Sequence, residues 1–573
     1  MATLMLGPGL SYDFAWQDIF GAAAWDYALI SKTGTVLAVQ SDDVNDIDQD
    51  FIILIEGTGF TYGQQEGYGD QDSPTGGTVT KITVYVDGNN DQVVNDGEPF
   101  ALAFSGLNIR LDQLAYTMFG YATPIFSRTD DPWAAVSLLL SGNDTIQLNE
   151  LANNFRLTVG ENRGNDRFLG SARDEFFDGN IGKDLYDGKG GTDTLSFIWR
   201  SIDDENASRG IVLDAIGKKV KALGTVTDPW GGKDTFKSIE KFEGTLNNDV
   251  MRGANQSTYT EWFQGFDGND TIDGRKGFDA VTYETDLQFP GGLHGITAVL
   301  KDKGFGTVID AFGARDKVVN VEMIVGTVFD DVMVGNKFAN TFAGLVGNDT
   351  IDGKGGIDTI DYSRNDYYKD KGVAGDGGIQ ADLAVTDGSG YSDIADGLGG
   401  TDHVRNVENV TGTSFADSIF GNASANVLRG GAGADQLGGG LGNDTLYGGM
   451  NEDGTDGDGA ADWFHFATAP GPNNIDTVRE FEVGTDVIYI YNNGAFPAYL
   501  DAGDGYLDAG EFASGAGVTE GDGPGVHFAY DTATGNLYYD DDATVPGSVL
   551  FARIFNAQGN PSTLSAGDIY IGD

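Results

Sequence analysis

Acidic residues recur every nine positions in the middle of the chain, and an apolar residue usually follows each of them two places later. From Gly412 to His465, six nonapeptides follow one another in this pattern. Their sixth positions are Asp417, Asn426, Asp435, Asp444, Asp453 and Asp462. Carboxylates repeated at a fixed spacing can bind a series of hard cations, because oxygen is the ligand that such ions prefer.

The same frame returns in three earlier blocks. One block runs from Gly326 to Asp361, one from Glu161 to Ser196, and one follows Asp249 after a shift of register. Asp144 and Asn153 form a degenerate opening pair. The sixth positions of these blocks are Asp166, Glu175, Asp184, Asp193, Asp249, Glu261, Asp270, Asp279, Asp331, Asn340, Asp349 and Asp358.

A period of nine residues fits a parallel β-solenoid. A Gly-rich turn of about six residues and a strand of about three make half a coil, so two repeats complete one coil. The apolar eighth residues then stack as the core, and the sixth residues of alternate repeats lie above one another. Stacked carboxylates roughly 4.8 Å apart repel each other unless a cation lies between them. An all-oxygen ligand set favours calcium over magnesium, which demands tighter octahedral geometry.

Two of the repeats, GGAGADQLG (430–438) and GGLGNDTLY (439–447), resemble the signature of RTX, or haemolysin-type, calcium-binding proteins. The resemblance covers roughly residues 142–490 and implies a parallel β-roll that binds several calcium ions in its turns. It implies that the sixth-position residues are side-chain ligands and that turn carbonyls complete the sites. These carbonyls include those of Gly430, Gly433, Gly439 and Gly442. The amides at Asn153, Asn340 and Asn426 and the shifted register around Gly253–Gln264 depart from the pattern. Gly- and Asp-rich turns without metal are the alternative.

Three long segments, residues 194–248, 280–330 and 359–416, separate the blocks and resemble one another. Their ends superpose first at Asp234, Asp316 and Asp402 and then at Glu240, Glu322 and Glu408. The repeating unit is therefore a module of roughly eighty residues, in which calcium coils precede a wider β-rich excursion. We expect the excursions to be enlarged coils of the same solenoid, and surface loops packed against it are the alternative.

The pattern as a whole predicts an all-β protein of three parts. Residues 1–141 form an N-terminal β-rich domain, residues 142–470 form the β-roll in about three modules, and residues 471–573 form a β-rich C-terminal cap. The first part contains a loop with the ligand spacing of an EF-hand, although Gln92 stands where glycine is usual. Its ligands would be Asp87, Asn89, Asp91, Val93, Asn95 and Glu98. A polar hairpin turn is the alternative.

The C-terminal part resembles the uncleaved region that type I secretion machinery reads in RTX proteins and serralysin-type proteases. The first twenty residues lack the basic start and apolar run of a cleaved signal peptide, and the chain has no Cys. These features imply one-step export to the cell surface or medium. In a cytosol poor in calcium the acidic coils would stay open, and calcium outside the cell would fold them.

Charge and motifs exclude several functions. The chain carries 34 Lys and Arg against 88 Asp and Glu, a net charge of −54, which disfavours nucleic acid as a partner. It has no apolar run long enough for a transmembrane helix. It has no H-E-x-x-H zinc motif, no G-x-S-x-G elbow and no P-loop or dinucleotide fingerprint, and residues 1–141 contain no His. We therefore expect that the protein is not an enzyme.

Three hypotheses about function follow. The first is an extracellular structural protein that associates with other copies of itself in a surface layer, sheath or filament, stiffened by calcium. The second is an adhesin or matrix protein that binds cell-surface polysaccharide. The third is an extracellular enzyme with an unrecognised site in residues 1–141.

Overall fold

The structure is a computed structural model, and the chain divides into two compact units, Met1–Ala280 and Val281–Asp573. The described residues are 164–203, 206–216, 223–256, 258–284, 294–370, 373, 377–449, 458–492, 495–496, 505–520, 525–540 and 547–572, together with the strands that precede residue 164.

The first unit begins with an antiparallel sheet. Its strands are β1 (Thr3–Leu6), β2 (Tyr27–Lys32), β3 (Val36–Ser41), β4 (Asp50–Gln64), β5 (Asp72–Asp87) and β6 (Phe100–Arg110). They pair in the order β2, β3, β4, β5, β6, β1, which confirms the β structure expected for this part. Strand β1 also pairs in parallel with β7 (Thr145–Leu148), which pairs with β9 (Arg167–Leu169), so this sheet continues into the repeats.

Asp87 is the last residue of β5. The other residues of the predicted EF-hand-like loop lie outside the described residues, and so do Asp144, Asn153 and Asp453. The undescribed loop positions are Asn89, Asp91, Val93, Asn95 and Glu98.

In the repeats of the first unit, the short strands of successive nonapeptides alternate between two sheets and pair in parallel within each sheet. The first sheet continues with β11 (Leu185–Asp187), β13 (Val212–Ala215), β14 (Leu223–Thr227), β15 (Lys233–Lys237), β17 (Val250–Arg252) and β19 (Thr271–Asp273). The second sheet contains β8 (Phe155–Leu157), β10 (Glu175–Asp178), β12 (Thr194–Ser196), β16 (Lys241–Glu243), β18 (Glu261–Gln264) and β20 (Asp279–Thr282). A short helix, α3 (Ile198–Asp203), follows β12. This is the β-roll that the nine-residue period predicts.

The second unit has the same two-sheet arrangement. Its first sheet contains β21 (Thr297–Lys301), β22 (Phe305–Ile309), β23 (Arg315–Val319), β25 (Val332–Val334), β27 (Thr350–Asp352), β29 (Gln380–Asp382), β30 (Ser392–Ala395), β31 (Thr401–Arg405), β33 (Ser418–Phe420), β35 (Gln436–Gly438), β37 (Trp463–Phe466), β39 (Val487–Tyr491), β40 (Gly505–Tyr506) and β45 (Ile569–Gly572). Its second sheet contains β24 (Met323–Val325), β26 (Thr341–Ala343), β28 (Thr359–Asp361), β32 (Asn409–Thr411), β34 (Val427–Arg429), β36 (Thr445–Tyr447), β38 (Asp476–Arg479), β41 (Phe512–Gly515), β42 (Phe528–Asp531), β43 (Asn536–Tyr539) and β44 (Val549–Ile554). Helix α4 (Asn365–Asp370) follows β28.

The eighth residues of the repeats stack along the interior, as predicted. Ile419 aligns with Leu437, and Leu437 aligns with Phe464 on the next strand of the same sheet. All three side chains are fully buried. In the first unit the rings of Phe168 and Tyr186 stack with their centroids 4.9 Å apart. The apolar side chains of the two sheets therefore form a shared core that holds each roll together.

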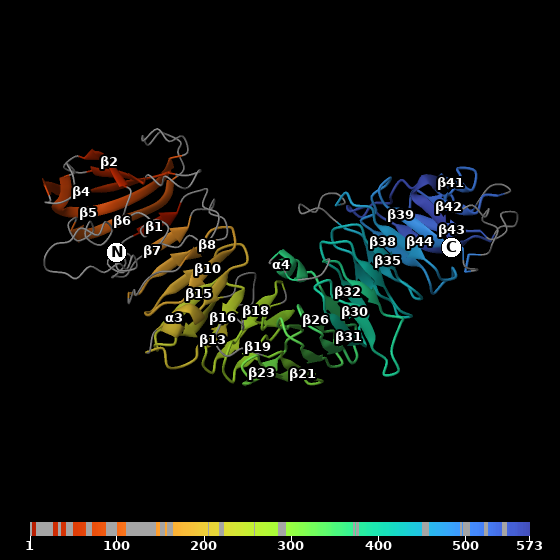
Figure 1. Cartoon of the computed structure of the whole chain (residues 1–573), viewed down its shortest axis with the longest axis horizontal. Coiled ribbons are helices and arrows are strands. Elements are labelled where there is room, and N and C mark those ends of the chain that lie inside the picture. Colours follow the sequence, from red (N-terminus) through yellow and green to blue (C-terminus); the bar gives the residue numbers. More distant parts are fainter. Residues whose placement is uncertain are drawn as a thin grey trace. The chain divides into compact units, whose positions relative to one another are not determined.

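The excursions are wide coils and not separate loops. In the first unit, β13, β14 and β15 form an antiparallel hairpin pair, while β15 pairs in parallel with β11 and β13 pairs in parallel with β17. In the second unit, β31 lies parallel to β27, and β29 lies parallel to β33. Strand β30 lies antiparallel between β29 and β31, and Figure 1 shows β30 beside β31. Each excursion therefore adds antiparallel strands to one sheet and ends on a strand that continues the roll.

The C-terminal strands continue the same stack. Strand β38 pairs in parallel with β36 and β44, and β39 pairs in parallel with β37 and β45. The boundary expected at residue 470 therefore falls inside the roll. The segment 475–490 supplies one strand to each sheet, and β42 and β43 form an antiparallel hairpin whose turn contains Gly535. No helix within the described residues is long and apolar enough to cross a bilayer.

Replacing Leu437 by alanine tests the apolar column. Leu437 is fully buried, so Leu437→Ala removes core contacts and should lower the free energy of unfolding by about 2 to 5 kcal/mol in calcium. Leu441, which lies in the following turn and is 53% exposed, provides the control, and Leu441→Ala should change it by less than about 0.5 kcal/mol. Denaturant unfolding measures both. Equal effects of the two substitutions would contradict the stacked core.

Candidate metal centres

The sixth-position residues form rows in which each backbone joins the next carboxylate. The N–H of Asp331 donates to Asp349 Oδ1 at 2.8 Å, and the N–H of Asp417 donates to Asp435 Oδ1 at 2.8 Å. We call these rows the carboxylate ladder. Its runs are Asp166–Asp184–Asp234, Glu175–Asp193–Glu240, Asp249–Asp270, Asp331–Asp349–Asp402, Asn340–Asp358–Glu408, Asp417–Asp435–Asp462–Asp486 and Asn426–Asp444–Asp476.

Six ladder members were not among the predicted ligands. Four belong to excursions, at positions where the three excursions superpose in sequence. The other two, Asp476 and Asp486, stand two places before the buried Val478 and Ile488, which is the spacing of the nonapeptides. The excursion members are Asp234, Glu240, Asp402 and Glu408. The spacing between acid and apolar residue, applied outside the Gly-rich segments, would have found the last two.

The second carboxylate oxygen is buried and has no hydrogen-bond partner in many rungs. These rungs are Asp184, Asp193, Asp234, Asp349, Asp358, Asp435 and Asp444. Each of these side chains is at most 2% exposed. An ionised oxygen in this position is unfavourable unless a cation compensates it.

The ladder carboxylates explain the glycine that opens most repeats. A Cβ added to Gly430 would lie less than 3.0 Å from Asp435 Oδ2, and one added to Gly439 would lie as close to Asp444 Oδ2. The space that a side chain would fill is therefore taken by the carboxylate five residues later. A larger residue in the first position would displace that oxygen.

Backbone carbonyls face the same spaces. The Gly448 carbonyl oxygen also lies less than 3.0 Å from the added Gly430 Cβ, beside Asp435 Oδ2. The carbonyls of Gly430 and Gly439 lie similarly close to Cβ positions built on the coil before theirs. Gly433 and Gly442 have φ values of +106° and +130°, which favour glycine at those turn positions.

The donor set therefore fits calcium. Among the described residues, no group of three or more acidic or histidine side chains is arranged to hold one metal ion. The sites instead combine carboxylate oxygens with turn carbonyls, and this mixture of hard oxygen donors suits calcium. The residues that would hold the ions are the ladder carboxylates with a free oxygen and the first-position glycine carbonyls.

Burial raises the pKa of the ladder carboxylates. The pKa of Asp349 is raised to about 10, first by burial and then by the charges of Asp402, Asp331 and Asp396. Burial likewise raises the pKa of Asp435 to about 9 and that of Asp476 to about 8. Without a cation, the fold therefore favours the protonated form of these groups at neutral pH.

The residues that open three blocks differ from the other rungs. Asp417 Oδ2 accepts the Thr413 N–H at 2.6 Å, and its Oδ1 accepts the Ile379 N–H at 2.6 Å. The Thr413 hydroxyl donates to the same carboxylate. Asp249 with Thr245 and Asp331 with Thr327 repeat this arrangement. Both oxygens of these three predicted ligands thus accept protein hydrogen bonds, and the Gly-Thr pair before each block is the sequence signal for it.

The amide and glutamate rungs also differ in how many of their side-chain oxygens accept protein hydrogen bonds. Asn426 Oδ1 accepts the Asn422 N–H at 2.9 Å. Both carboxylate oxygens of Glu175 accept hydrogen bonds from Ser171. The glutamate side chain, which is longer than that of aspartate, reaches the turn that contains Ser171. Glu261 accepts the Ala254 N–H through one oxygen and keeps the other without a partner. Asp166, Asp270, Asp279 and Asp462 are buried.

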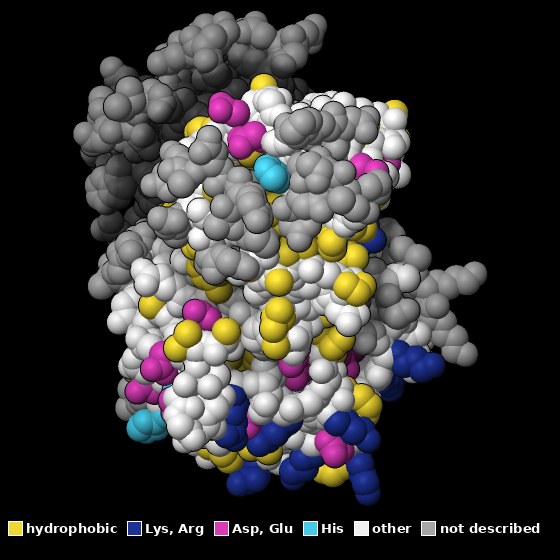
Figure 2. All heavy atoms as spheres, turned by 90° about the vertical axis from the view of Figure 1, so that its right-hand side faces the viewer, with side chains coloured by type: hydrophobic (Ala, Val, Ile, Leu, Met, Phe, Trp, Pro, Cys, Tyr) yellow, Lys and Arg dark blue, Asp and Glu magenta, His cyan; other side chains and the backbone are white. Residues whose placement is uncertain are grey.

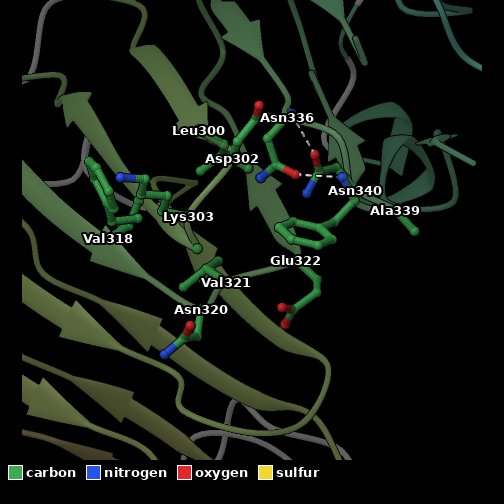
Figure 3. A pocket seen from close by; sticks show the side chains of 13 residues that line it. Leu300, Asp302, Lys303, Val318, Asn320, Val321, Glu322, Asn336, Ala339 and Asn340 are labelled. Atoms are coloured by element: carbon green, nitrogen blue, oxygen red, sulfur yellow. Dashed lines mark hydrogen bonds between the residues drawn. The ribbon is translucent and has the colours of Figure 1, made fainter. Parts of the chain in front are cut away.

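Asn340 borders a cavity of about 390 Å³ between the β21–β23 hairpin and the following turns (Figure 3). Asn340 Oδ1 accepts the Asn336 N–H at 3.0 Å, so this amide braces its own turn. The cavity is lined by both apolar and polar side chains, among them Phe338, Asn320 and Glu322. An amide replaces the ladder carboxylate at this rung, so the position loses the negative charge that a calcium ligand supplies.

Substitution of Asp444 separates metal binding from hydrogen bonding. Asp444→Asn keeps an oxygen for the Asn426 N–H and removes the charge, so it should weaken calcium binding and lower the melting temperature only in calcium. Asp417→Asn is the matched control, because the amide nitrogen of Asn cannot accept one of the two backbone hydrogen bonds that the Asp417 oxygens accept. It should lower the melting temperature with and without calcium. Calorimetry and thermal unfolding measure both, and a calcium-independent loss in Asp444→Asn would refute the assignment.

The raised pKa values predict an inverted pH dependence in metal-free buffer. Asp435 titrates near 3.9 in an unfolded chain and at about 9 in the fold. Its contribution to stability is fully present below the unfolded value and is lost as pH rises through the folded value. The metal-free melting temperature should therefore fall between pH 5 and pH 9, while the gain from adding calcium should grow. Circular dichroism melts at both pH values measure this, and a metal-free roll that gains stability over this range would contradict it.

Comparison with known proteins agrees with this geometry. The family model of the RTX calcium-binding nonapeptide repeat matches four segments, residues 162–195, 262–281, 325–360 and 411–446. A search of curated proteins gives no match. The matched segments contain the stacked strands, the first-position glycines and the ladder carboxylates described above. RTX nonapeptides bind calcium, so several ions bind along the roll. The chain therefore contains four segments of RTX calcium-binding nonapeptide repeats.

Proposed function

We propose that the protein is an extracellular structural protein that folds on calcium binding after export and then assembles with further copies of itself. The observation that carries this proposal is the carboxylate ladder, whose buried free oxygens have no protein partner and favour the ionised form only beside a cation. The stability of such a fold depends on its surroundings and is highest where calcium is abundant.

Calcium-dependent folding suits a chain that is exported across the cell envelope in an unfolded state. The calcium concentration in the cytosol is far below that of the medium, where millimolar calcium can saturate weak sites. Ligand binding then contributes directly to folding, because the sites do not exist in the open chain. This coupling supports export by a type I system, which the C-terminal resemblance implies.

A basic surface supports association between copies. The side chains of Lys301, Lys303, Arg315 and Lys317 are exposed on β21–β23, with Asp302 as the acidic residue among them. We call this set the basic hairpin face. Lys and Arg side chains gather at the lower end of the view in Figure 2. In a chain of net charge −54, such a face can pair with the acidic surface of another copy.

An aromatic surface favours the alternative, which is polysaccharide binding. Trp463, Tyr489 and Tyr570 lie on neighbouring strands of the first sheet, with ring centroids 5.5 to 5.7 Å apart. Tyr506 extends the group and is 56% exposed. Flat aromatic faces of this kind can stack on sugar rings. In both hypotheses the chain has no catalytic role, and an active site in residues 1–141 is the competing idea.

Electron microscopy and light scattering of the full chain test assembly. With calcium the protein should form polymers, and in chelator it should be monomeric and melt at a lower temperature. The double variant Lys301→Glu/Lys317→Glu should fold in calcium but assemble less, because the basic hairpin face is reversed. Lys337→Glu/Lys354→Glu, with the same change in charge elsewhere, should assemble normally. Monomers in calcium that bind a cell-surface polysaccharide would favour the alternative.

A further inference from the structure

Each excursion hairpin carries an aspartate in the turn before its last strand. Asp228 lies between β14 and β15, Asp310 between β22 and β23, and Asp396 between β30 and β31. Each precedes the ladder residue of its own excursion by six positions. All three lie outside the nonapeptide frame and outside the four segments that match the RTX repeat.

Asp396 uses only half of its carboxylate within the protein. Its Oδ1 accepts the N–H groups of Leu398 and Gly400, each at 2.8 Å, and this closes the turn. Its Oδ2 is buried and accepts no hydrogen bond, although the residue is 0% exposed. A buried carboxylate oxygen without a partner is unfavourable, and the turn itself does not require it.

Asp228 in the first unit has the same arrangement. Its Oδ1 accepts the N–H groups of Trp230 and Gly232 at 2.9 and 2.7 Å. Its Oδ2 also lacks a partner, and the residue is 0% exposed. Two independent copies of the hairpin therefore leave the same oxygen unused.

The unused oxygen faces a carbonyl of the neighbouring nonapeptide coil. A Cβ added to Gly400 would lie less than 3.0 Å from both Asp396 Oδ2 and the Gly347 carbonyl oxygen. A Cβ added to Gly232 would lie as close to Asp228 Oδ2 and the Gly182 carbonyl oxygen. Glycine leaves this space open, and two hard oxygen atoms from different coils border it.

We propose that Asp396 and Asp228 each bind a calcium ion of their own, which fastens the excursion hairpin to the adjacent coil of the roll. The free carboxylate oxygen of the hairpin and the carbonyl oxygen of Gly347 or Gly182 are the first ligands of each ion. Oxygen donors of this kind, one anionic and one neutral, suit hard cations such as calcium. The third hairpin has Ala314 where the other two have Gly232 and Gly400, so the inference is confined to these two.

A nearby turn shows what the same motif does without a metal. Asp387 Oδ1 accepts the N–H groups of Ser389 and Tyr391 at 2.7 and 3.0 Å, as Asp396 does with its own turn. Asp387 is exposed, however, and its other oxygen lies 3.6 Å from His403 Nε2. The turn hydrogen bonds are therefore common to both sites, whereas burial and the facing carbonyl belong to Asp396.

Native mass spectrometry of the calcium-loaded full chain tests the inference by counting ions. Asp396→Asn and Asp228→Asn retain the oxygen that closes the turn and remove the charge. Each should lose one ion relative to the unchanged protein, and the double variant should lose two. Asp387→Asn, with the same turn hydrogen bonds, should lose none. An unchanged ion count in both Asp396→Asn and Asp228→Asn would overturn the proposal.

Thermal unfolding provides a second readout that is independent of export and assembly. In calcium, Asp396→Asn should melt at a lower temperature than the unchanged protein. In chelator it should melt at the same or a higher temperature, because the substitution removes an uncompensated buried charge. An equal loss in both media would show that Asp396 only braces its turn, and this result would also overturn the proposal.

Discussion

The structure depends on the different roles of the two oxygens within each ladder carboxylate. One oxygen of a ladder aspartate accepts the backbone N–H of the coil before it, which fixes the side chain and the distance between coils. The other oxygen is buried and points into the turn without a protein partner. The hydrogen bond alone would leave a row of uncompensated charges, and the cation alone would find no preorganised ligands. Because both interactions are needed, the coil and the calcium site form together.

This constraint explains features of the sequence that composition does not. Glycine opens most repeats because a carboxylate oxygen occupies the space of its Cβ, as at Gly430 and Gly439. The apolar eighth residue must be fully buried, as Leu437 is, because the three-residue strands offer few other contacts. The ladder carboxylates contribute to the net charge of −54, and bound calcium offsets part of this charge.

The nine-residue period was sufficient to predict the parallel roll, its apolar column and the rungs from Asp184 to Asp444, because each depends on local spacing. It could not show which rungs keep a free oxygen. Asp417 has the sequence context of a ligand, yet Thr413 and Ile379 occupy both of its oxygens, and the second contact comes from a strand almost forty residues away. Asp228 and Asp396 were missed for the same reason, since their turns meet the roll only after the excursion has folded back.

The threonine-capped aspartates have a consequence for how the roll comes apart. Asp331 and Asp417 join an excursion to the first coil of the next block through protein hydrogen bonds at both oxygens, so these junctions hold without metal. The coils that follow them hold only while ions are present. Removing calcium would then unfold each block from the coil farthest from the threonine-capped aspartate. Refolding on addition of calcium would begin at that aspartate, where the first rung is already in place.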